Sequence, residues 1–346
     1  MSASEPEDWR SRSPLAVTMG EPAGIGTEVT LKAWRNRESG TPAFFLIDDP
    51  DRVRRCADRL GWDIPVAAIE GPTDATVRFD NALPVLSHSV PVHPEPGHPS
   101  TENGRAVIGA IERAVELVRD GAASAVVTNP IHKRVLYEAG FTHPGHTEFL
   151  AALAGTGEPP VMMLACPELR VIPVTVHLPF RAVANALSTE TIIACGRIAD
   201  RDLRLNFGIE RPRLAVAGLN PHAGEEGAIG REEIDIIAPA VAQLKAEGIA
   251  ASGPYPADSL FHPAARADAD VVLCMYHDQA LIPLKTLDFW GGVNVTLGLP
   301  FIRTSPDHGT GFAIAGTGKA NEASFVASLA MAADMAAHRH AVLGDG

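Results

Sequence analysis

The sequence predicts an α/β protein with a mostly parallel sheet and helices on its faces. Short apolar, β-branched runs alternate along most of the chain with stretches of helical periodicity, and this alternation is typical of that class. Runs such as AVVT and DVVLCM are apolar almost throughout, as expected of strands that are buried on both faces. The length of 346 residues favours two domains.

The predicted elements follow one another in chain order. Strands are expected over 15–19, 43–47, 123–128, 161–166, 170–176, 213–217 and 270–275, and helices over 27–37, 103–120, 189–206, 232–247 and 321–340. The helix over 103–120 has the clearest pattern, because Val107, Ile111, Ala114, Val115 and Val118 fall on one stripe. Breaks rich in proline or glycine are predicted at 84–99, 130–144 and 291–300.

Composition excludes several classes of protein. There are 42 acidic residues against 29 basic ones, for a net charge of −13, which argues against nucleic acid or an anionic membrane as a partner. The four cysteines lie far apart, so reduced thiols in a cytoplasmic protein are expected rather than a disulfide framework. Neither a secretory leader nor an apolar run long enough to span a membrane is expected.

A glycine-rich turn follows the first predicted strand, in LAVTMGEPAGIGTEV over 15–29. Gly20, Gly24 and Gly26 permit positive φ and leave backbone N–H groups free at the start of the next helix, which suits an anion. The segment lacks the G-x-G-x-x-G spacing of a Rossmann dinucleotide site. An ordinary tight turn between a strand and a helix is the alternative interpretation.

Three histidines stand near the carboxyl ends of apolar runs: His177 in VIPVTVHLP, His222 in LNPHAGEEG and His277 in VVLCMYHDQ. Ligands bind at this edge of open α/β sheets, and three imidazoles that leave one position open are the ligand set of a catalytic divalent metal. A structural role for each histidine is the alternative. Three more histidines lie five residues apart in the Pro-rich segment 84–99, a spacing that gives no common face and disfavours a metal site.

Other polar residues are candidates for binding an anionic substrate. PGHTEFL places His146 and Thr147 just before a predicted helix, and Lys285, Asn294 and Arg303 lie further along the chain. A lysine and an arginine flanking an amide suit a phosphate or a carboxylate, to which arginine presents a bidentate fork. Taken alone, each residue is more typical of a surface charge than of a ligand-binding group.

Two aspartates and a second glycine-rich segment complete the candidates. Asp258 in YPADSLF and Asp278 beside His277 are suited to orienting a histidine or to acting as a base. The segment DHGTGFAIAGTGKAN, residues 307–321, leads into the C-terminal helix. It would either wrap a nucleotide or form a long turn.

Together these motifs make the chain similar to the 4-hydroxythreonine-4-phosphate dehydrogenase family of vitamin B6 (pyridoxine) biosynthesis. The segments GEPAGIG, TNPIHK, GHTEFL, GLNPHAGE, PADSLF, MYHDQ, NVTLGLPFIRTSPDHGT and AGTGKAN occur in the family's order. The resemblance runs from Leu15 to the C-terminal helix and leaves out the first dozen residues and the Pro-rich loop. GIGTEV and DHGTGFAIAGTGKAN also resemble the coenzyme loops of isocitrate and isopropylmalate dehydrogenases, which implies two α/β/α domains around a central cleft.

The resemblance implies particular roles for the candidate residues. It implies a divalent metal (zinc, magnesium or cobalt) held by His177, His222 and His277, with Asp258 as a candidate general acid or base. Contacts with a small phosphorylated substrate are implied for His146, Thr147, Lys285, Asn294 and Arg303. NAD or NADP is implied at the loop over 307–321, through Asp307, His308, Gly309, Gly316 and Asn321.

The resemblance also implies a domain division and an assembly. Domain 1 is expected at 14–135 plus 300–346 and carries the coenzyme loops. Domain 2 is expected at 136–299 and carries the metal and the dimer interface. The implied assembly is a homodimer whose active site is shared between the subunits.

The implied reaction is the metal-dependent, NAD(P)-linked oxidation and decarboxylation of 4-phosphooxy-L-threonine to 3-amino-2-oxopropyl phosphate. A cation at the substrate hydroxyl lowers its pKa while the coenzyme accepts hydride, and it stabilises the enolate left by loss of CO2. One alternative is a dehydrogenase of the same fold acting on threonate or erythronate 4-phosphate or on an aromatic cis-dihydrodiol carboxylate. The others are a three-histidine metallohydrolase of a small phosphoester and a non-catalytic binding protein.

Overall fold

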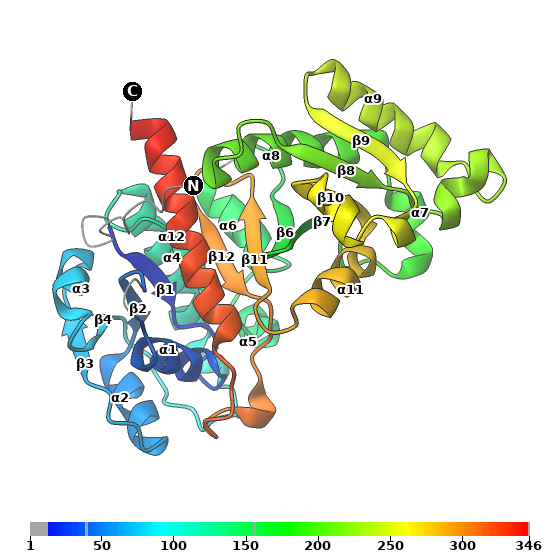
Figure 1. The fold of residues 1–346 in the computed structure, drawn as a ribbon. Helices are drawn as coiled ribbons and strands as arrows, with labels where there is room; N and C mark the ends of the chain where they lie inside the picture. The colour runs from blue at the N-terminus through cyan, green and yellow to red at the C-terminus, as the bar shows by residue number, and fades with distance from the viewer. Residues whose placement is uncertain (1–12, 39–40, 156, 345–346) are drawn as a thin grey trace. The chain divides into compact units, whose positions relative to one another are not determined.

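The computed structural model describes residues 13–38, 41–155 and 157–344. They form two compact units (Figure 1). The first unit comprises the described residues up to Gly157 together with Leu299–Ala336, and the second comprises Glu158–Gly298 together with the described residues from Ala337 on. Strands alternate with helices in both units, so the predicted α/β class is confirmed.

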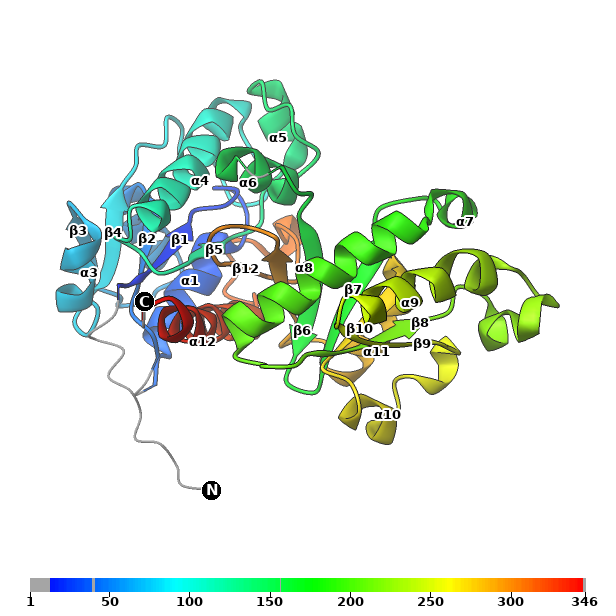
Figure 2. The same cartoon turned by 90° about the horizontal axis from the view of Figure 1, so that it is seen from above.

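The first unit is a parallel sheet between two layers of helices. Its strands are β1 (Leu15–Thr18), β2 (Phe44–Asp48), β3 (Val66–Ile69), β4 (Leu83–Ser87), β5 (Val126–Thr128) and β12 (Arg303–Pro306). Its helices are α1 (Gly26–Arg35), α2 (Pro50–Arg59), α3 (Pro72–Arg78), α4 (Gly104–Arg119), α5 (Lys133–Glu138), α6 (His146–Ala154) and the start of α12 (Ala323–Gly344). The strand order is β3-β4-β2-β1-β5-β12, with parallel pairing. Figure 2 shows α4 and α6 on one face of this sheet and α1 and α12 on the other.

The second unit has a mixed sheet. Its strands are β6 (Val161–Cys166), β7 (Leu169–Thr175), β8 (Arg213–Ala217), β9 (Ala250–Tyr255), β10 (Val271–Tyr276) and β11 (Val293–Leu297). Its helices are α7 (Val183–Ala186), α8 (Thr189–Phe207), α9 (Ala238–Ala246), α10 (Pro263–Ala267) and α11 (His277–Leu287). The order is β11-β6-β7-β10-β8-β9. β6 is antiparallel to β11 and to β7, whereas β7, β10, β8 and β9 are parallel.

Helix periodicity and capping account for the elements that the sequence predicted. The predicted stripe of α4 packs in the core of the first unit, with Val107, Ile111, Ala114 and Val115 buried and Val118 partly buried against them. α8 begins where the Ser188 hydroxyl accepts a hydrogen bond from the backbone N–H of Thr191, 3.2 Å away.

The structure corrects several of the predicted boundaries, and the break expected at 130–144 contains α5. The break expected at 291–300 contains β11, and the break expected at 84–99 begins inside β4. The helix expected over 232–247 starts with a π turn at Glu233–Ile237 before α9. No described helix has the length and apolar character needed to cross a membrane.

Candidate active site

The three predicted metal-ligating histidines follow three neighbouring strands of the second unit. His177 lies two residues beyond β7, His277 comes directly after β10, and His222 follows β8. These strands are adjacent in the order β7-β10-β8 and run parallel. Their carboxyl ends therefore lie at one edge of the sheet, as the sequence predicted. Asp258 follows β9, the next parallel strand along this edge.

Two side chains tie these strand ends together. The Thr175 hydroxyl at the end of β7 donates to the carbonyl of Met275 on β10 at 2.7 Å. Gln279 accepts a hydrogen bond from the N–H of Met275 at 2.6 Å and donates to the carbonyl of Gly218, just after β8, at 2.8 Å. Both side chains are buried. The backbone segments that lead to the three histidines are thus joined by side-chain hydrogen bonds as well as by the sheet.

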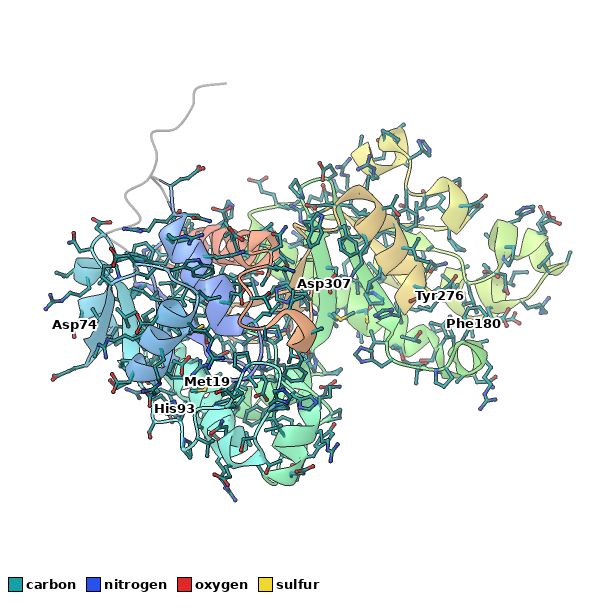
Figure 3. The ribbon with its side chains drawn as sticks, turned by 90° about the horizontal axis from the view of Figure 1, so that it is seen from below. Met19, Asp74, His93, Phe180, Tyr276 and Asp307 are labelled. Atoms are coloured by element: carbon teal, nitrogen blue, oxygen red, sulfur yellow. The ribbon has the colours of Figure 1, made fainter. Side chains whose placement is uncertain are left out.

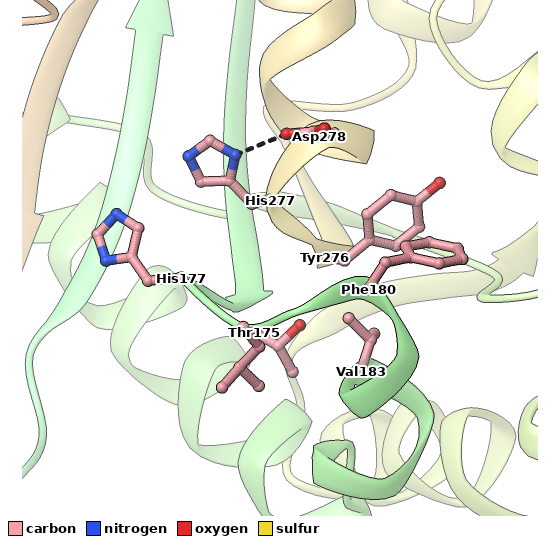
Figure 4. Close-up of a pocket in the computed structure, with 8 residues that line it drawn as sticks. Thr175, His177, Phe180, Val183, Tyr276, His277 and Asp278 are labelled. Carbon is pink, nitrogen blue, oxygen red and sulfur yellow. Dashed lines mark hydrogen bonds and ion pairs between the residues drawn. The ribbon is translucent and has the colours of Figure 1, made fainter.

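His177 and His277 face the same pocket. Their ring centroids are 5.8 Å apart, and the pocket has a volume of about 210 Å³. Figure 4 shows the two imidazoles on one side and the rings of Phe180 and Tyr276 on the other; these two rings make an edge-to-face contact in the second unit (Figure 3). Nδ1 of His277 lies 2.8 Å from the Asp278 carboxylate. Nε2 is then the ring nitrogen that could bind a metal, because a carboxylate at the other nitrogen orients metal-binding histidines in this way.

His222 is not brought into this pocket. It begins a left-handed turn in which five consecutive residues, 222–226, have φ between 43° and 78°. Its Nδ1 lies 2.7 Å from the Glu225 carboxylate, and this carboxylate, with a smaller contribution from Asp258, raises the pKa of His222. Within the described ranges no group of three or more His, Cys, Asp or Glu side chains is positioned to hold a metal ion. The structure therefore pairs His177 with His277 and places His222 with Asp258.

The donor set fits a divalent metal on chemical grounds. His277 and His222 each direct Nδ1 toward a carboxylate, which orients the other ring nitrogen as a ligand. His177 and His222 are both non-glycine residues at φ 52°. Backbone in this region costs about 1–3 kcal/mol and is concentrated at functional sites.

A buried carboxylate that the sequence analysis missed anchors the His222 turn. Oε1 of Glu233 accepts hydrogen bonds from the N–H groups of Leu219 and Asn220 at 2.8 and 2.7 Å, and Oε2 accepts from the Asn220 side chain at 3.0 Å. Glu233 lies in the π turn before α9 and is only 4% exposed. A glutamate in a predicted helix carries no sign of this role.

Replacing Glu233 with alanine is expected to lower the free energy of unfolding by about 3 kcal/mol, because three donors lose a buried charged acceptor. Chemical denaturation monitored by circular dichroism measures this. The control is Asp235→Ala, which removes an exposed carboxylate that pairs with Arg231 and should cost about 0.5 kcal/mol or less. Equal losses in the two variants would contradict the anchoring role.

Two predicted substrate residues of the second unit lie on α11 and β11. Lys285 is in the last turn of α11, the helix that begins at His277, and its Nζ lies 5.9 Å from the ring centroid of Phe289. Asn294 is on β11, and its side-chain Oδ1 is buried with no hydrogen-bond partner among the described residues. Buried polar atoms are nearly always bonded. This atom is therefore available to a ligand.

Arg303 is a buried cation in the first unit. It lies on β12, and its guanidinium donates to the Thr128 hydroxyl on neighbouring β5, with Nη2 at 2.6 Å and Nε at 3.2 Å. Burial lowers the pKa of Arg303 to about 10. A charged group at such a position becomes favourable when an anion joins it.

His146 lies next to this cation. It begins α6, with Thr147 as the second residue of the helix, and its Nε2 is buried with no partner among the described residues. Burial, and then the charges of Arg303 and Lys133, hold the pKa of His146 well below its ordinary value. The ring is therefore neutral at physiological pH. His146, Arg303 and Lys133 form an electropositive group suited to a phosphate.

The predicted coenzyme loop packs against α1. The carboxylate of Glu28 accepts hydrogen bonds from the backbone N–H groups of Gly316 at 3.1 Å and Ala320 at 3.0 Å. The N–H of Ile25, just before α1, donates to the carbonyl of Thr310 at 3.0 Å. The two glycine-rich segments that the sequence singled out, at 20–26 and 307–321, are thus in contact within one unit.

The remaining predicted coenzyme residues are held by local contacts. The backbone N–H of Asp307 donates a hydrogen bond to the Ser324 hydroxyl oxygen at 2.9 Å, and the ring of His308 lies 3.0 Å from the carbonyl of Gly309. The Asn321 side chain accepts from the N–H of Ala323 at 2.8 Å, which caps α12.

Glu21, in the first glycine-rich turn, is a buried carboxyl group that the sequence analysis did not single out. Oε1 accepts a hydrogen bond from the N–H of Ala23 at 3.1 Å, and Oε2 has no partner in the described part of the chain. Burial raises the pKa of Glu21 to about 7, although the Ala23 N–H and the charge of Arg52 oppose this. The folded state therefore favours the protonated acid.

Glu21 is expected to make folding stability depend on pH. A carboxyl group with a raised folded-state pKa stabilises the folded protein most below its unfolded pKa of about 4.5, and that contribution is lost as pH rises to about 7. Glu21→Gln should therefore match the parent near pH 4 and exceed its free energy of unfolding by about 3 kcal/mol at pH 8. Urea denaturation at both pH values, with the exposed Glu102→Gln as control, measures this. If the free energies of unfolding of Glu21→Gln and the parent differed by the same amount at both pH values, Glu21 would not titrate between them.

The chain is similar to known proteins over nearly its whole length. Residues 41–332 match the family described as pyridoxal phosphate biosynthetic protein PdxA. A protein of Bradyrhizobium diazoefficiens named 4-hydroxythreonine-4-phosphate dehydrogenase is 53% identical over 336 residues, which cover 94% of this chain and 97% of that protein. The crystal structure of a 4-hydroxythreonine-4-phosphate dehydrogenase from Klebsiella pneumoniae matches with a TM-score of 0.85 and 39% identity, covering 94% of this chain and 99% of that one. A terephthalate 1,2-cis-dihydrodiol dehydrogenase from Burkholderia xenovorans matches with a TM-score of 0.63 and 28% identity, covering 93% and 98%.

Proposed function

The chain belongs to the PdxA family, and from this premise we propose that it oxidises and decarboxylates 4-phosphooxy-L-threonine to 3-amino-2-oxopropyl phosphate, with NAD or NADP and a divalent metal ion. The observation that carries the proposal is the alignment of His177, His277 and His222 at the carboxyl ends of three adjacent parallel strands. This alignment occurs in a chain that matches dehydrogenases of this name over nearly its whole length.

The substrate phosphate is assigned to the electropositive group of the first unit. Arg303 offers a guanidinium fork, and the neutral His146 and the hydroxyl of Thr147 offer further hydrogen bonds. Lys285 and Asn294 are assigned to the rest of the substrate. The buried Oδ1 of Asn294, which has no hydrogen-bond partner in the described part of the chain, is an acceptor, and it suits the amino group of 4-phosphooxy-L-threonine.

His177, His222 and His277 would hold the metal, which when bound lowers the pKa of the substrate hydroxyl and stabilises the negative charge that develops on its oxygen. The residues around it have separate roles. Asp278 orients the ring of His277, and Thr175 and Gln279 fix the strand ends. Asp258, on the same edge as His222, is assigned as the group that accepts the hydroxyl proton.

NAD or NADP is assigned to the loop over 307–321, where Asp307, His308, Gly309, Gly316 and Asn321 provide backbone and side-chain contacts; the coenzyme accepts the hydride. Glu28 holds this loop against α1 through its hydrogen bonds to Gly316 and Ala320. The coenzyme-binding domain is assigned to 14–135 plus 300–346 and the metal-binding domain to 136–299, although α6 belongs to the first compact unit, which continues to Gly157.

A homodimer that shares its active site between subunits is part of the proposal. Large apolar side chains are exposed in the second unit: Leu178 and Phe180, which line the pocket of His177 and His277, and also Ile282, Phe289 and Trp290. Contiguous exposed apolar side chains mark interaction surfaces. Sedimentation equilibrium should give a dimer, with twice the chain mass of 36.5 kDa. The charged variant Phe180→Asp should shift the protein toward the monomer mass of 36.5 kDa.

The second candidate is a dehydrogenase of the same fold acting on threonate or erythronate 4-phosphate. It is favoured by the same electropositive group, because Arg303 and His146 do not distinguish an amino substituent from a hydroxyl. The match to a terephthalate dihydrodiol dehydrogenase supports variation of substrate within the fold.

Absorbance at 340 nm distinguishes these functions. Purified protein is incubated with 4-phosphooxy-L-threonine, NAD⁺ or NADP⁺, and Zn²⁺, Mg²⁺ or Co²⁺, beside a chelated control. Metal-dependent formation of reduced coenzyme is the expected result. Reaction with threonate or erythronate 4-phosphate alone would transfer the assignment to the second candidate. Hydrolysis of a phosphoester without coenzyme reduction would replace the proposal with a metallohydrolase.

A further inference from the structure

A second cavity lies in the first unit beside the coenzyme loop. Its volume is about 300 Å³, which is at the lower end of the range for small-molecule sites. Three segments line it: the turn before α1 with the first residues of that helix, one face of α2, and residues 93–96 of the Pro-rich segment. Gly316 of the coenzyme loop lies at its edge. The cavity is outside the electropositive group at Arg303 and His146.

One stripe of α2 supplies the cationic wall. The helix starts with Pro50, after Asp49 accepts hydrogen bonds from the N–H groups of Asp51 and Arg52. Positions three, four and seven residues apart share one face of a helix. The cavity is lined by the residues of α2 in that pattern, Arg52, Arg55, Cys56 and Arg59.

The three arginines of this stripe have different contacts. Arg52 is buried and pairs with the Asp48 carboxylate, and Arg59 pairs with Glu95 at 2.8 Å. Arg55 instead contacts an imidazole: its Nη2 lies 2.9 Å from Nδ1 and 2.6 Å from Nε2 of His93. Arg55 is therefore the arginine of this stripe whose charge faces an imidazole rather than a carboxylate.

The Pro-rich segment is packed against the coenzyme loop. A Cβ at Gly316, which has φ +71°, would lie 2.7 Å from Cγ of Pro96, so the two backbones approach closely because position 316 is glycine. The N–H of Gly97 donates to the carbonyl of Ala23 at 2.8 Å. Residues 93–97 thus form a wall beside the loop that the proposed function assigns to the coenzyme.

We infer that this cavity binds the adenosine end of the coenzyme and that Arg55 and His93 bind a phosphate on its ribose, so that the chain prefers NADP to NAD. This inference rests on the proposed function for the location of the coenzyme. His93 is labelled in the first unit in Figure 3. A phosphate monoester accepts hydrogen bonds from the guanidinium fork and from a ring N–H at the same time.

Two carboxylates also line the cavity, and both are already engaged. Glu28 accepts two hydrogen bonds from the coenzyme loop, and Glu95 is paired with Arg59. An anion therefore gains most at Arg55. A coenzyme without the ribose phosphate makes no use of the Arg55–His93 pair.

Binding of nucleotide fragments tests the inference without turnover. Isothermal titration calorimetry compares 2′,5′-ADP with AMP, which differ in the ribose phosphate, on the whole protein. The parent is expected to bind 2′,5′-ADP at least about 10-fold more tightly, as expected for a hydrogen bond to a charged group. Arg55→Ala and His93→Ala should abolish that preference. The matched control is Arg54→Ala, because Arg54 is the neighbouring exposed arginine, pairs with Asp51 and does not line the cavity.

Equal binding of the two fragments by the parent, or an unchanged preference in Arg55→Ala, would overturn the inference. Steady-state kinetics give the second readout: KM for NADP⁺ should rise about 10-fold in Arg55→Ala while KM for NAD⁺ stays constant. Fragment discrimination without any dehydrogenase activity would contradict the proposed function and leave the phosphate site standing. Turnover that uses NAD⁺ and NADP⁺ equally in both the parent and Arg55→Ala would support the proposed function and contradict the phosphate site.

Discussion

Replacing His277 with alanine is expected to lower kcat/KM by about 1,000-fold. Charge stabilisation by a bound metal contributes several kcal/mol to the transition state, and about 1.4 kcal/mol corresponds to a factor of ten in rate. His277 is fixed by its position at the end of β10 and by the Asp278 carboxylate, so a neighbouring side chain does not replace it. Initial rates of coenzyme reduction and metal content by mass spectrometry measure the effect together.

Two further variants separate ligation from folding. Asp278→Asn keeps the imidazole and weakens its orientation, and a loss of about 10- to 100-fold is expected. His340→Ala removes an exposed histidine of α12 and should leave both rate and metal content unchanged. If His277→Ala kept the full metal content and the parent rate, His277 would not be a ligand.

Replacing Arg303 with methionine is expected to lower kcat/KM for the phosphorylated substrate by about 100-fold, mainly through KM. Loss of charge-assisted hydrogen bonds to a phosphate removes about 1.5–3 kcal/mol. The loss should disappear when 4-hydroxy-L-threonine, which lacks the phosphate, is the substrate. Arg303→Lys should recover part of the affinity, since it restores the charge without the planar fork.

The free energy of unfolding of Arg303→Met distinguishes a loss of phosphate binding from a loss of folding. Burial lowers the pKa of Arg303 to about 10, so burying this charge costs free energy, and a neutral apolar side chain of similar length should not reduce the free energy of unfolding. Thr128→Val tests whether Thr128 positions the guanidinium, because the Thr128 hydroxyl accepts hydrogen bonds from Nε and Nη2 of Arg303. An unchanged KM in Arg303→Met would remove Arg303 from the phosphate site.

Local pattern predicted much of the fold, and the reasons for its failures are physical. The buried runs that became β1, β7, β8 and β10 are nearly all apolar, and the stripe of α4 is continuous. β11 was missed because glycine and proline flank its five residues. β3 was missed because it is short and only partly buried.

The candidate site could be predicted only where a strand delivers a residue directly. His177 and His277 lie at the ends of adjacent strands and face one pocket. His222 lies five residues beyond β8, and its position depends on a left-handed turn and on Glu233, neither of which has a sequence signature. Thr128 and Arg55 acquire their significance from contacts with residues far away in the chain.

The left-handed turn at 222–226 bears on how tolerant this chain is of substitution. A non-glycine residue in that conformation is less stable than glycine by about 1–2 kcal/mol, and Ala223, Glu225 and Glu226 all adopt it. A library of variants selected for heat resistance alone should accumulate glycine or asparagine at these three positions and lose every β-branched residue there. Selection for turnover should retain Glu225, whose carboxylate holds the His222 ring. Comparing the two enriched populations would show where, in a stretch of five residues, thermal robustness and activity favour different amino acids.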